Sequence, residues 1–387
     1  MKQQHISPKF LDSNATTPVD PEVVQAMLPY FNENFGNPSS SDNIHAMDAK
    51  NAVERARETI AEYINAEPKE IIFTSGATES NNTAIFGVIP HPMAKGSHIV
   101  TTEIEHKAIL ECVDYFCELG GEVDYVRLND DGTVDIDHLK SLIKENTKLV
   151  SIHAANNEIG TIQDLETIGK ITAERKVHFH TDAVQALGLV PLDVRKQNIS
   201  LMSLSAHKIY GPKGIGVLFI RKRRPRVKLK PLILGGGQEF GLRSGTLNVP
   251  AIVGFGKAVE ILKKKGNDIR INLERNRDLL WELLQQIPEV ELNGPEKNRI
   301  PNNLNIWIKG VEAKALINMV SQFISISTSS ACTTSSVEPS HVLARLYGSE
   351  KRAFESIRIG LGRHITEEDV RETAGILATA IQKIRAI

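Results

Sequence analysis

A lysine and an aspartate 26 residues apart are the residues of this chain best suited to chemistry. Lys208 lies in SLSAHKIYGPKG, directly behind a segment typical of a buried strand, and Asp182 lies in HFHTDAVQ. Pyridoxal 5'-phosphate needs a lysine amine for its Schiff base and a carboxylate against its pyridine nitrogen, so that the protonated ring can accept electrons. The pair therefore predicts a site for this cofactor.

The residues around the aspartate allow two interpretations. Asp182 follows an apolar strand, so it should be at least partly buried, where an unpaired carboxylate is expensive. It could equally belong to a structural ion pair with a lysine or an arginine. Gln185, three residues further on, could donate to the cofactor's phenolate oxygen. His106, in TTEIEHKAI, could stack on the ring or exchange protons, or could make only one local hydrogen bond at the end of a strand.

A phosphate site is predicted where the strand EIIFT meets the helical pattern ESNNTAIFGVI. The segment Ser75-Gly76-Ala77-Thr78 between them is small and polar. At a helix N-terminus such residues let backbone N–H groups and the helix dipole meet an anion. The commoner role of such a segment is simply to cap the helix. Ser205 and His207, next to Lys208, can also donate hydrogen bonds and so favour the phosphate site.

The three cysteines fall into two kinds of setting. Cys332 lies in STSSACTTSSVEPS, which has no periodic apolar stripe and is predicted to be an exposed loop. An accessible thiol that can ionise is a nucleophile. Cys112 and Cys117 lie on the helical pattern HKAILECVDYFCEL, where both are expected to be buried as small hydrophobic residues. The spacing fits neither a disulfide framework nor a metal site, so none is predicted.

Composition sets the class of protein. With 387 residues and a net charge of −1, the chain has no global field to recruit nucleic acid or a membrane. Neither a signal-peptide pattern nor an apolar run near the ~20 residues needed to span a bilayer is present, so a soluble cytoplasmic protein is expected. The basic run RKRRPRVKLK from Arg221 suggests a nucleic-acid contact or an edge hairpin kept soluble by charge, and we favour the hairpin.

The elements that would position these residues alternate along the chain. Strand-like runs lie near residues 70–75, 98–102, 149–155, 177–182, 200–205 and 216–222, with amphipathic stretches between most of them. This alternation predicts an α/β fold with a mainly parallel, helix-covered sheet. A long helical pattern then precedes short strands near ELNG and NNLNIWI. We therefore predict a large domain over 15–262 and a small domain formed by 1–14 and 263–387.

Many motifs in one order give the chain a resemblance to a known family. They include LDSNATTP, FGNPSS, FTSGATESNN, EHKAI, NNEIGTIQ, HTDAVQALG, SLSAHKIYGPKG, GGGQEFGLRSGT, SSACTTSSVEPS and SIRIGLGR. The chain resembles, end to end, the NifS/IscS-type cysteine desulfurases, which are fold-type I pyridoxal-phosphate enzymes. The resemblance implies a large domain with a mainly parallel seven-stranded sheet, and a smaller α+β domain that carries the catalytic cysteine loop.

The resemblance also implies a role for each site residue. Lys208 would form the Schiff base, Asp182 would hold the pyridine nitrogen, and His106 would stack above the ring. Gln185 and Asn157 would flank the phenolate and the substrate, and Arg358 would clamp the substrate carboxylate. The phosphate would be held by Ala77, Thr78, Ser205 and His207, and by Thr246 of the neighbouring subunit. A homodimer with active sites at its interface follows from this resemblance.

The implied reaction converts L-cysteine to L-alanine. Lys208 removes the α-proton, and the thiolate of Cys332 takes the sulfur as a persulfide. A sulfur-acceptor protein in iron–sulfur cluster assembly would then receive it. The same activity could instead supply tRNA thiolation or DNA phosphorothioation, although direct nucleic-acid binding is not expected. An aminotransferase or lyase with Cys332 incidental is the alternative of another class, and a non-enzymatic partner protein would have no need of the site.

Three departures from the family pattern stand out. Ser329 occupies a place where relatives usually have glycine, which restricts the backbone before Ala-Cys. Asp42 and His45 lie near the places of a histidine and a glycine. The chain also ends at IQKIRAI, without the long tail by which the housekeeping iron–sulfur members engage their scaffold protein, so a different acceptor is expected.

Overall fold

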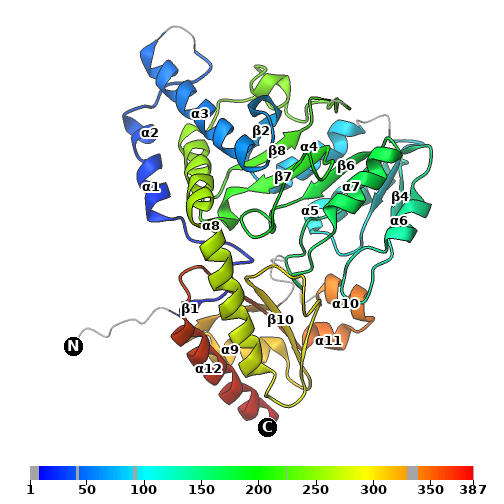
Figure 1. Ribbon diagram of the computed structural model, residues 1–387, viewed down its shortest axis with the longest axis vertical. Coiled ribbons are helices and arrows are strands. Elements are labelled where there is room, and N and C mark those ends of the chain that lie inside the picture. Colours follow the sequence, from blue (N-terminus) through cyan, green and yellow to red (C-terminus); the bar gives the residue numbers. More distant parts are fainter. Residues whose placement is uncertain (1–7, 41–42, 90–93, 224, 329–338, 387) are drawn as a thin grey trace.

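The computed structural model describes residues 8–40, 43–89, 94–223, 225–328 and 339–386. Figure 1 shows a larger sheet with helices on both sides and, below it, a smaller sheet that packs against the C-terminal helix. One long helix, α8 (Val249–Leu284), runs from the first part into the second. Within the described residues, no helix is both long and apolar enough to cross a membrane.

The larger sheet has seven strands in the order β2-β8-β7-β6-β5-β3-β4. Strands β7, β6, β5, β3 and β4 are parallel, whereas β8 is antiparallel to both β2 and β7. The predicted α/β fold with a mainly parallel seven-stranded sheet is therefore confirmed. The strands are β2 (Ile71–Thr74), β3 (His98–Thr101), β4 (Glu122–Tyr125), β5 (Thr147–Ser151), β6 (His178–Asp182), β7 (Leu201–Ser205) and β8 (Gly216–Ile220).

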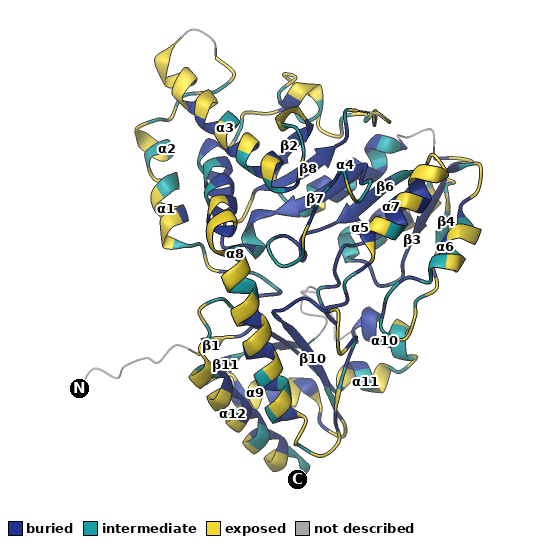
Figure 2. Ribbon diagram, viewed as in Figure 1, coloured by how far each residue is buried: buried dark blue, intermediate teal, exposed yellow. Residues whose placement is uncertain are grey.

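Alternate residues of these strands enter two different cores because side chains of a strand point to opposite faces. Phe73, Val100, Phe179 and Phe219 pack against α3, α7 and α8 on one face. Their neighbours Ile72, Ile99 and Leu218 pack against α4 and α5 on the other. These helices are α3 (Ile44–Tyr63), α4 (Ala77–Val88), α5 (Lys107–Glu118) and α7 (Leu165–Glu174). Figure 2 shows the strands dark blue between helices whose outer faces are yellow.

A second, antiparallel sheet has the order β12-β13-β10-β9. Its strands are β9 (Val290–Leu292), β10 (Asn303–Ile308), β12 (Ser327–Thr328) and β13 (Ser356–Gly360). It shares a core with α9 (Ala313–Val320), α12 (Glu367–Arg385) and the last turns of α8. A separate parallel pair joins β1 (Lys9–Phe10) to β11 (Ile324–Ser325). The start of the chain thus pairs with this second part.

The remaining elements are short and connect the layers. The α-helices are α1 (Pro21–Met27), α2 (Pro29–Asn32), α6 (Ile136–Leu142), α10 (His341–Tyr347) and α11 (Glu350–Phe354). Single 3₁₀ turns lie at η1 (Pro68–Glu70), η2 (Ala206–Lys208) and η3 (Glu239–Gly241). Helix α8 contributes Leu262 to the larger core and Leu273 to the smaller one. The predicted division near residue 262 falls inside this helix and stays a prediction.

The basic run after β8 does not form the edge hairpin that we predicted. β8 lies inside the sheet between β2 and β7, and β2 is the edge strand. The described residues from Arg221 to Lys230 are irregular, with Val227 N donating to Arg221 O at 3.0 Å. The alternating pattern of basic and apolar residues suggested a strand. Proline and the dense charge instead allow a solvated loop.

A buried ion pair fixes the loop over residues 231–248 to strand β2. Two guanidinium nitrogens of Arg57 donate to the Glu239 carboxylate at 2.7 and 2.9 Å. The same carboxylate accepts from Phe73 N at 2.7 Å, and Arg57 also donates to Ile71 O at 2.7 Å. Glu239 and Phe240 both have positive φ, at 49° and 58°, which costs energy for residues other than glycine. The pair therefore holds a strained turn against the sheet.

Glu239→Ala should lower the free energy of unfolding by about 3–5 kcal/mol, because Arg57 would stay buried without its buried partner and keep only the exposed carboxylate of Glu54. Urea denaturation followed by circular dichroism, on the first unfolding transition, measures the change. Lys263→Ala is the matched control: it removes an exposed ion pair with Glu62 and should change stability by less than about 1 kcal/mol. Equal effects of the two variants would show that the Arg57–Glu239 pair does not hold the turn.

Candidate active site

A cavity of about 500 Å³ lies at the carboxyl ends of the central parallel strands. Ligands of open α/β sheets bind at this edge because the loops that follow neighbouring strands meet there. Most of the residues predicted for a cofactor site line this one cavity. They are Ala77, Thr78, His106, Asn157, Asp182, Gln185, Ser205, His207 and Lys208. The structure thus brings together residues from five separate stretches of chain.

Lys208 ends the 3₁₀ turn that follows β7. Its Nζ donates to Asn14 O and to Ala15 O, at 2.6 Å each. Both carbonyls belong to the segment after β1, almost two hundred residues away in sequence. The amine is therefore held against the cavity wall by two backbone carbonyl groups.

Asp182 is the last residue of β6 and is buried, as predicted. One carboxylate oxygen accepts from Asn81 Nδ2 at 2.8 Å, and the other accepts from Val184 N at 3.1 Å. Asn81 comes from α4, so the carboxylate is oriented by an amide from the neighbouring helix. Both donors are neutral, which leaves the negative charge of Asp182 available to a cationic group in the cavity.

The N-terminus of α4 forms another part of the wall. Gly76 is the N-cap residue and provides no side-chain cap, and the backbone N–H groups of the first turn have no acceptor within the helix. Ser75 N donates instead to Glu79 Oε2 at 2.9 Å. The segment therefore supplies the N-cap residue of the helix, as the alternative interpretation had it, but no side-chain cap for its first turn. Free N–H groups and the helix dipole at the cavity suit a phosphate.

Two of the three histidines that line the cavity are the predicted residues His106 and His207. Burial, together with Lys208 and Lys213, lowers the pKa of His207 to about 4, so its imidazole is neutral near pH 7. Its Nδ1 lies 3.1 Å from Thr16 Oγ1. His106 is the N-cap of α5, and its Nδ1 accepts from Ala108 N at 3.1 Å. The local hydrogen bond that we had considered therefore exists, and in the neutral ring it places the proton on Nε2.

Arg358 lies behind the cavity rather than in its lining. It is only 1% exposed, in the middle of β13, and donates to Asp12 Oδ1 at 2.8 Å and to Asn157 O at 3.3 Å. Ser327 Oγ also donates to Asp12 Oδ1, at 3.0 Å. Asn157 lines the cavity and therefore lies between the cavity and the guanidinium group of Arg358. The Nε group of Arg358 is buried and has no hydrogen-bond partner among the described residues.

Several predicted residues lie elsewhere. Thr246 is exposed in the loop after η3 and does not line the cavity of its own chain. Cys332, Ser329 and Asp42 lie outside the described residues. His45 stacks on Phe35, with ring centroids 5.5 Å apart.

The prediction for the two helical cysteines is half wrong. Cys112 is buried, and burial raises the pKa of its thiol to about 12. Cys117 is exposed. Five residues advance an α-helix by about 500°, or roughly 140° around its axis, so Cys117 leaves the face that packs on the sheet. The chain therefore has one exposed thiol outside the segment of Cys332.

The side chains of the cavity that sequence reasoning missed include Asn14, Asn81 and His153. Asn14 Nδ2 donates to Gln185 Oε1 at 3.3 Å, and Gln185 Nε2 donates to Asn14 O at 2.9 Å. The motifs LDSNATTP and FTSGATESNN contain Asn14 and Asn81, and could have identified them. No local pattern singles out His153.

A buried carboxyl group lies next to Asn157. Burial raises the pKa of Glu158 to about 7, against the opposing effects of Ser340, Arg358 and His106. Ser340 Oγ donates a short hydrogen bond to Glu158 Oε2, and Ser340 is the N-cap of α10. Glu158 therefore ties the loop after β5 to the start of α10.

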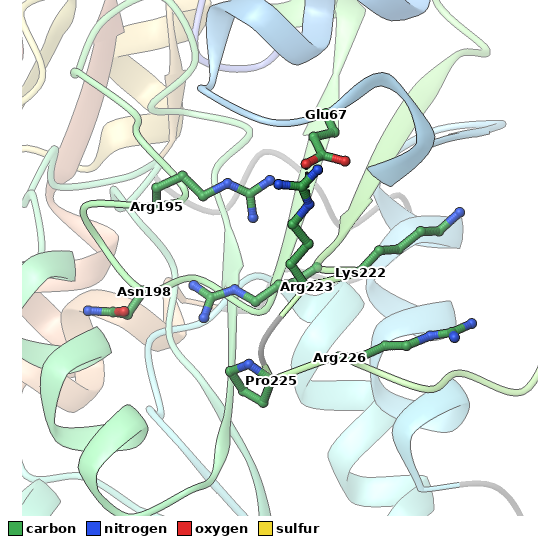
Figure 3. Close-up of a pocket in the computed structure, with 8 residues that line it drawn as sticks. Glu67, Arg195, Asn198, Lys222, Arg223, Pro225 and Arg226 are labelled. Carbon is green, nitrogen blue, oxygen red and sulfur yellow. Dashed lines mark ion pairs between the residues drawn. The ribbon is translucent and has the colours of Figure 1, made fainter.

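The basic run lines a second, open hollow of about 690 Å³, which shares no lining residue with the first. Figure 3 shows the guanidinium groups of Arg195 and Arg223 directed toward Glu67, while Lys222 and Arg226 extend to the right of the view. Arg223 Nε lies 2.5 Å from Glu67 Oε1, and Arg195 pairs with Glu70. Neighbouring carboxylates thus offset part of this charge.

Comparisons with known proteins agree with the fold. The family described as aminotransferase class-V matches residues 9–372. Cysteine desulfurase IscS of Neisseria meningitidis (serogroup C, serotype 2a) is 46% identical over 381 residues, which cover 98% of this chain and 94% of that protein. The chain therefore belongs to the class-V aminotransferase family and, within it, to the NifS/IscS-type cysteine desulfurases.

Solved structures give the same result. One described as a NifS-like protein has a TM-score of 0.90 and 36% identity, with 98% of this chain and all of that chain covered. Another, described as SspA in complex with cysteine, has a TM-score of 0.81 and 37% identity, with 92% of this chain and all of that one covered. The family that the motifs predicted is confirmed.

The residues of the cavity fit pyridoxal phosphate by their chemistry. They provide an amine, a buried carboxylate held only by neutral donors, and a helix N-terminus with free N–H groups. These match the aldehyde, the ring nitrogen and the phosphate of the cofactor, in that order.

Glu158→Gln should flatten the dependence of stability on pH. Because the pKa of Glu158 is raised from 4.5 to about 7, the folded state binds its proton more tightly than the unfolded state between these values. Its contribution to stability therefore falls as pH rises through this window, by up to about 1.4 kcal/mol per pH unit. Urea denaturation at pH 5, 6 and 7 measures the slope, which should be less negative in the variant.

Asp369→Asn is the control for this slope. Lys9 lowers the pKa of Asp369 to about 2, so its contribution changes below pH 4 and not between pH 5 and 7. If the unfolding free energy has the same pH slope in wild-type protein, Asp369→Asn and Glu158→Gln, Glu158 is ionised throughout this range.

Proposed function

We propose that this chain is a pyridoxal-phosphate-dependent cysteine desulfurase that converts L-cysteine to L-alanine and takes the sulfur onto Cys332 as a persulfide. The observation that carries the proposal is the single cavity that joins Lys208, Asp182 and the N-terminus of α4. Membership of the NifS/IscS-type family supports it, as does the likeness to a structure described as bound to cysteine.

Each part of the cofactor has residues suited to hold it. Lys208 Nζ would bond to the aldehyde carbon, and Asp182 would hold the ring nitrogen. The first turn of α4, with Thr78, Ser205 and the neutral His207, would donate to the phosphate. Gln185 and Asn157 would flank the phenolate oxygen, and His106 would lie over the ring. When bound, pyridoxal phosphate supplies an electron sink for the substrate α-carbon.

The chain's own groups account for the proton and sulfur steps. Arg358 would bind the carboxylate of L-cysteine, held in orientation by Asp12. Lys208 Nζ, freed by the incoming amine, removes the α-proton. The thiolate of Cys332 then attacks the substrate sulfur. The carbon–sulfur bond breaks, and its electron pair stays with the substrate β-carbon, which takes up a proton. Lys208 returns a proton to the α-carbon, and L-alanine leaves.

A protein acceptor would take the sulfur from Cys332. We place this step in cytoplasmic iron–sulfur cluster assembly, because of the similarity to the IscS proteins. Supply of sulfur for tRNA thiolation or DNA phosphorothioation uses the same chemistry, and only the acceptor distinguishes these pathways. An aminotransferase or lyase would leave Cys332 incidental, which the first experiment below tests.

The site also requires a second copy of the chain. Thr246 is exposed and lies away from the cavity of its own chain. The same loop exposes large apolar side chains, with Leu234 79% and Phe240 56% exposed, beside Leu232 and Ile233. Contiguous exposed apolar residues mark interaction surfaces. A homodimer that covers this loop would bring Thr246 to the phosphate site of the partner subunit.

Cys332→Ser should abolish alanine formation while the protein still binds L-cysteine. Wild-type protein incubated with L-cysteine should gain about one sulfur atom (~32 Da), removable by a reductant and mapped to Cys332. Cys117→Ser is the matched control, because Cys117 is the exposed thiol among the described residues, and it should keep both the alanine and the adduct. Full turnover in Cys332→Ser would instead favour an aminotransferase or lyase.

Mixed dimers should show whether Thr246 acts across the interface. Lys208→Ala and Thr246→Ala chains, each tagged differently, are co-expressed and the heterodimer is purified. If Thr246 serves the partner subunit, one of the two sites has both residues intact, so the heterodimer should regain about half of the wild-type pyridoxal phosphate content and activity. A heterodimer no better than the two parent homodimers would place Thr246 at the site of its own chain.

A further inference from the structure

A buried histidine lies beside the proposed ring-binding carboxylate. His153 follows β5, lines the cavity and is 4% exposed. Ala154 N donates to Asp182 O at 2.9 Å, which continues the pairing of β5 with β6. His153 therefore lies next to the end of the strand that presents Asp182.

The partner of this histidine is a second buried carboxylate, Glu105. Glu105 Oε1 lies 2.8 Å from His153 Nδ1 and accepts from His153 N at 3.1 Å and from Thr102 Oγ1 at 2.8 Å. Its other oxygen, Oε2, is buried and has no hydrogen-bond partner among the described residues. A carboxylate in this position needs a cation, because an uncompensated buried charge is expensive.

The electrostatics of the pair favour an imidazolium. Burial alone would lower the pKa of His153, but Glu105 and then Asp182 outweigh it and raise that pKa. Both ring nitrogens of His153 are buried and make no hydrogen bond to the described residues, so the close contact of Nδ1 with Glu105 is electrostatic. The imidazolium group of His153 therefore carries a positive charge beside the carboxylates of Glu105 and Asp182.

The other histidines near this cluster are neutral. Burial lowers the pKa of His180 to about 4, and its two nitrogens contact Ser151 Oγ and Ser203 Oγ. Burial also lowers the pKa of His341, which contacts Glu105 O through Nε2. The other titratable cations and histidines that line the cavity are Lys208, Lys213, His106 and His207. Among the described residues, His153 is the group in ion-pair contact with Glu105.

We propose that His153 is a positioning residue, which as an imidazolium between Glu105 and Asp182 sets how firmly Asp182 holds the proton of the cofactor's ring nitrogen. This rests on the proposed cofactor site, and not on the sulfur chemistry. Without the cation, two buried carboxylates would act together on the ring and hold its proton more tightly. With it, the charge of Glu105 is cancelled, and Asp182 acts alone.

The test is a pH titration of the visible absorbance of the purified, pyridoxal-phosphate-loaded protein, without L-cysteine. His153→Asn keeps a donor toward Glu105 but removes the charge. It should raise the apparent pKa of the bound chromophore by about 0.5–1 unit. His180→Asn is the matched control, because it replaces a buried neutral histidine of the neighbouring strand, and it should leave that pKa unchanged. Equal pKa values in wild-type protein and His153→Asn would overturn the proposal.

A second measurement reads His153 directly. Nuclear magnetic resonance of protein with labelled histidine should give His153 a pKa above that of a free histidine, and Glu105→Gln should lower it. A His153 pKa at or below the ordinary value in wild-type protein would also overturn the proposal, even if His153→Asn fails to fold. Wild-type protein that shows no bound chromophore would instead refute the proposed cofactor, so the two failures are distinguishable.

Discussion

The parallel pairing of β6 with β7 is the constraint on which the site depends. Asp182 pairs with Ser203 across the two strands, so the ends of both strands reach the same edge of the sheet. Strand β7 ends at Ser205, and the turn that follows it places His207 and Lys208 in the same cavity as Asp182. Because the register of a buried parallel pair is fixed by two packed faces, the carboxylate and the amine are held on a rigid frame. Side chains from helices and loops add to that frame but do not create it.

The same frame explains why the neutral and charged partners are distributed as they are. Asp182 is oriented by Asn81 and by a backbone N–H, which satisfy its oxygens without neutralising it. Glu105, further from the cavity, contacts a histidine that can be cationic. A buried carboxylate intended for a ligand must remain uncompensated until that ligand binds, whereas a structural one must be compensated in advance. Asp182 and Glu105 therefore have different partners because Asp182 would hold a ligand, whereas Glu105 holds a side chain of the protein.

The local sequence was sufficient to predict the strands of the large sheet that are buried on both faces. Six strands of the large sheet are almost wholly buried and were predicted, whereas β4 (EVDY) is a half-exposed edge strand and was missed. The lysine, the aspartate and the helix N-terminus follow such strands, so they too were predictable. Asn14 reaches Lys208 across almost two hundred residues, and Cys117 is exposed by its angle around α5. Neither fact can be derived from neighbouring residues alone.

Hydrogen bonds connect the residues at and behind the cavity to residues outside its lining. Arg358 is oriented by Asp12, and Asp12 is also bonded by Ser327, in the strand that precedes residue 329. Glu158 contacts Ser340, which begins the helix that follows residue 338. The two ends of the segment that contains Cys332 are thus bonded to the residues next to the proposed substrate site. A change in the charge of Glu158 or Asp12 would therefore alter the anchors of that segment and the site together, because they share the same hydrogen bonds.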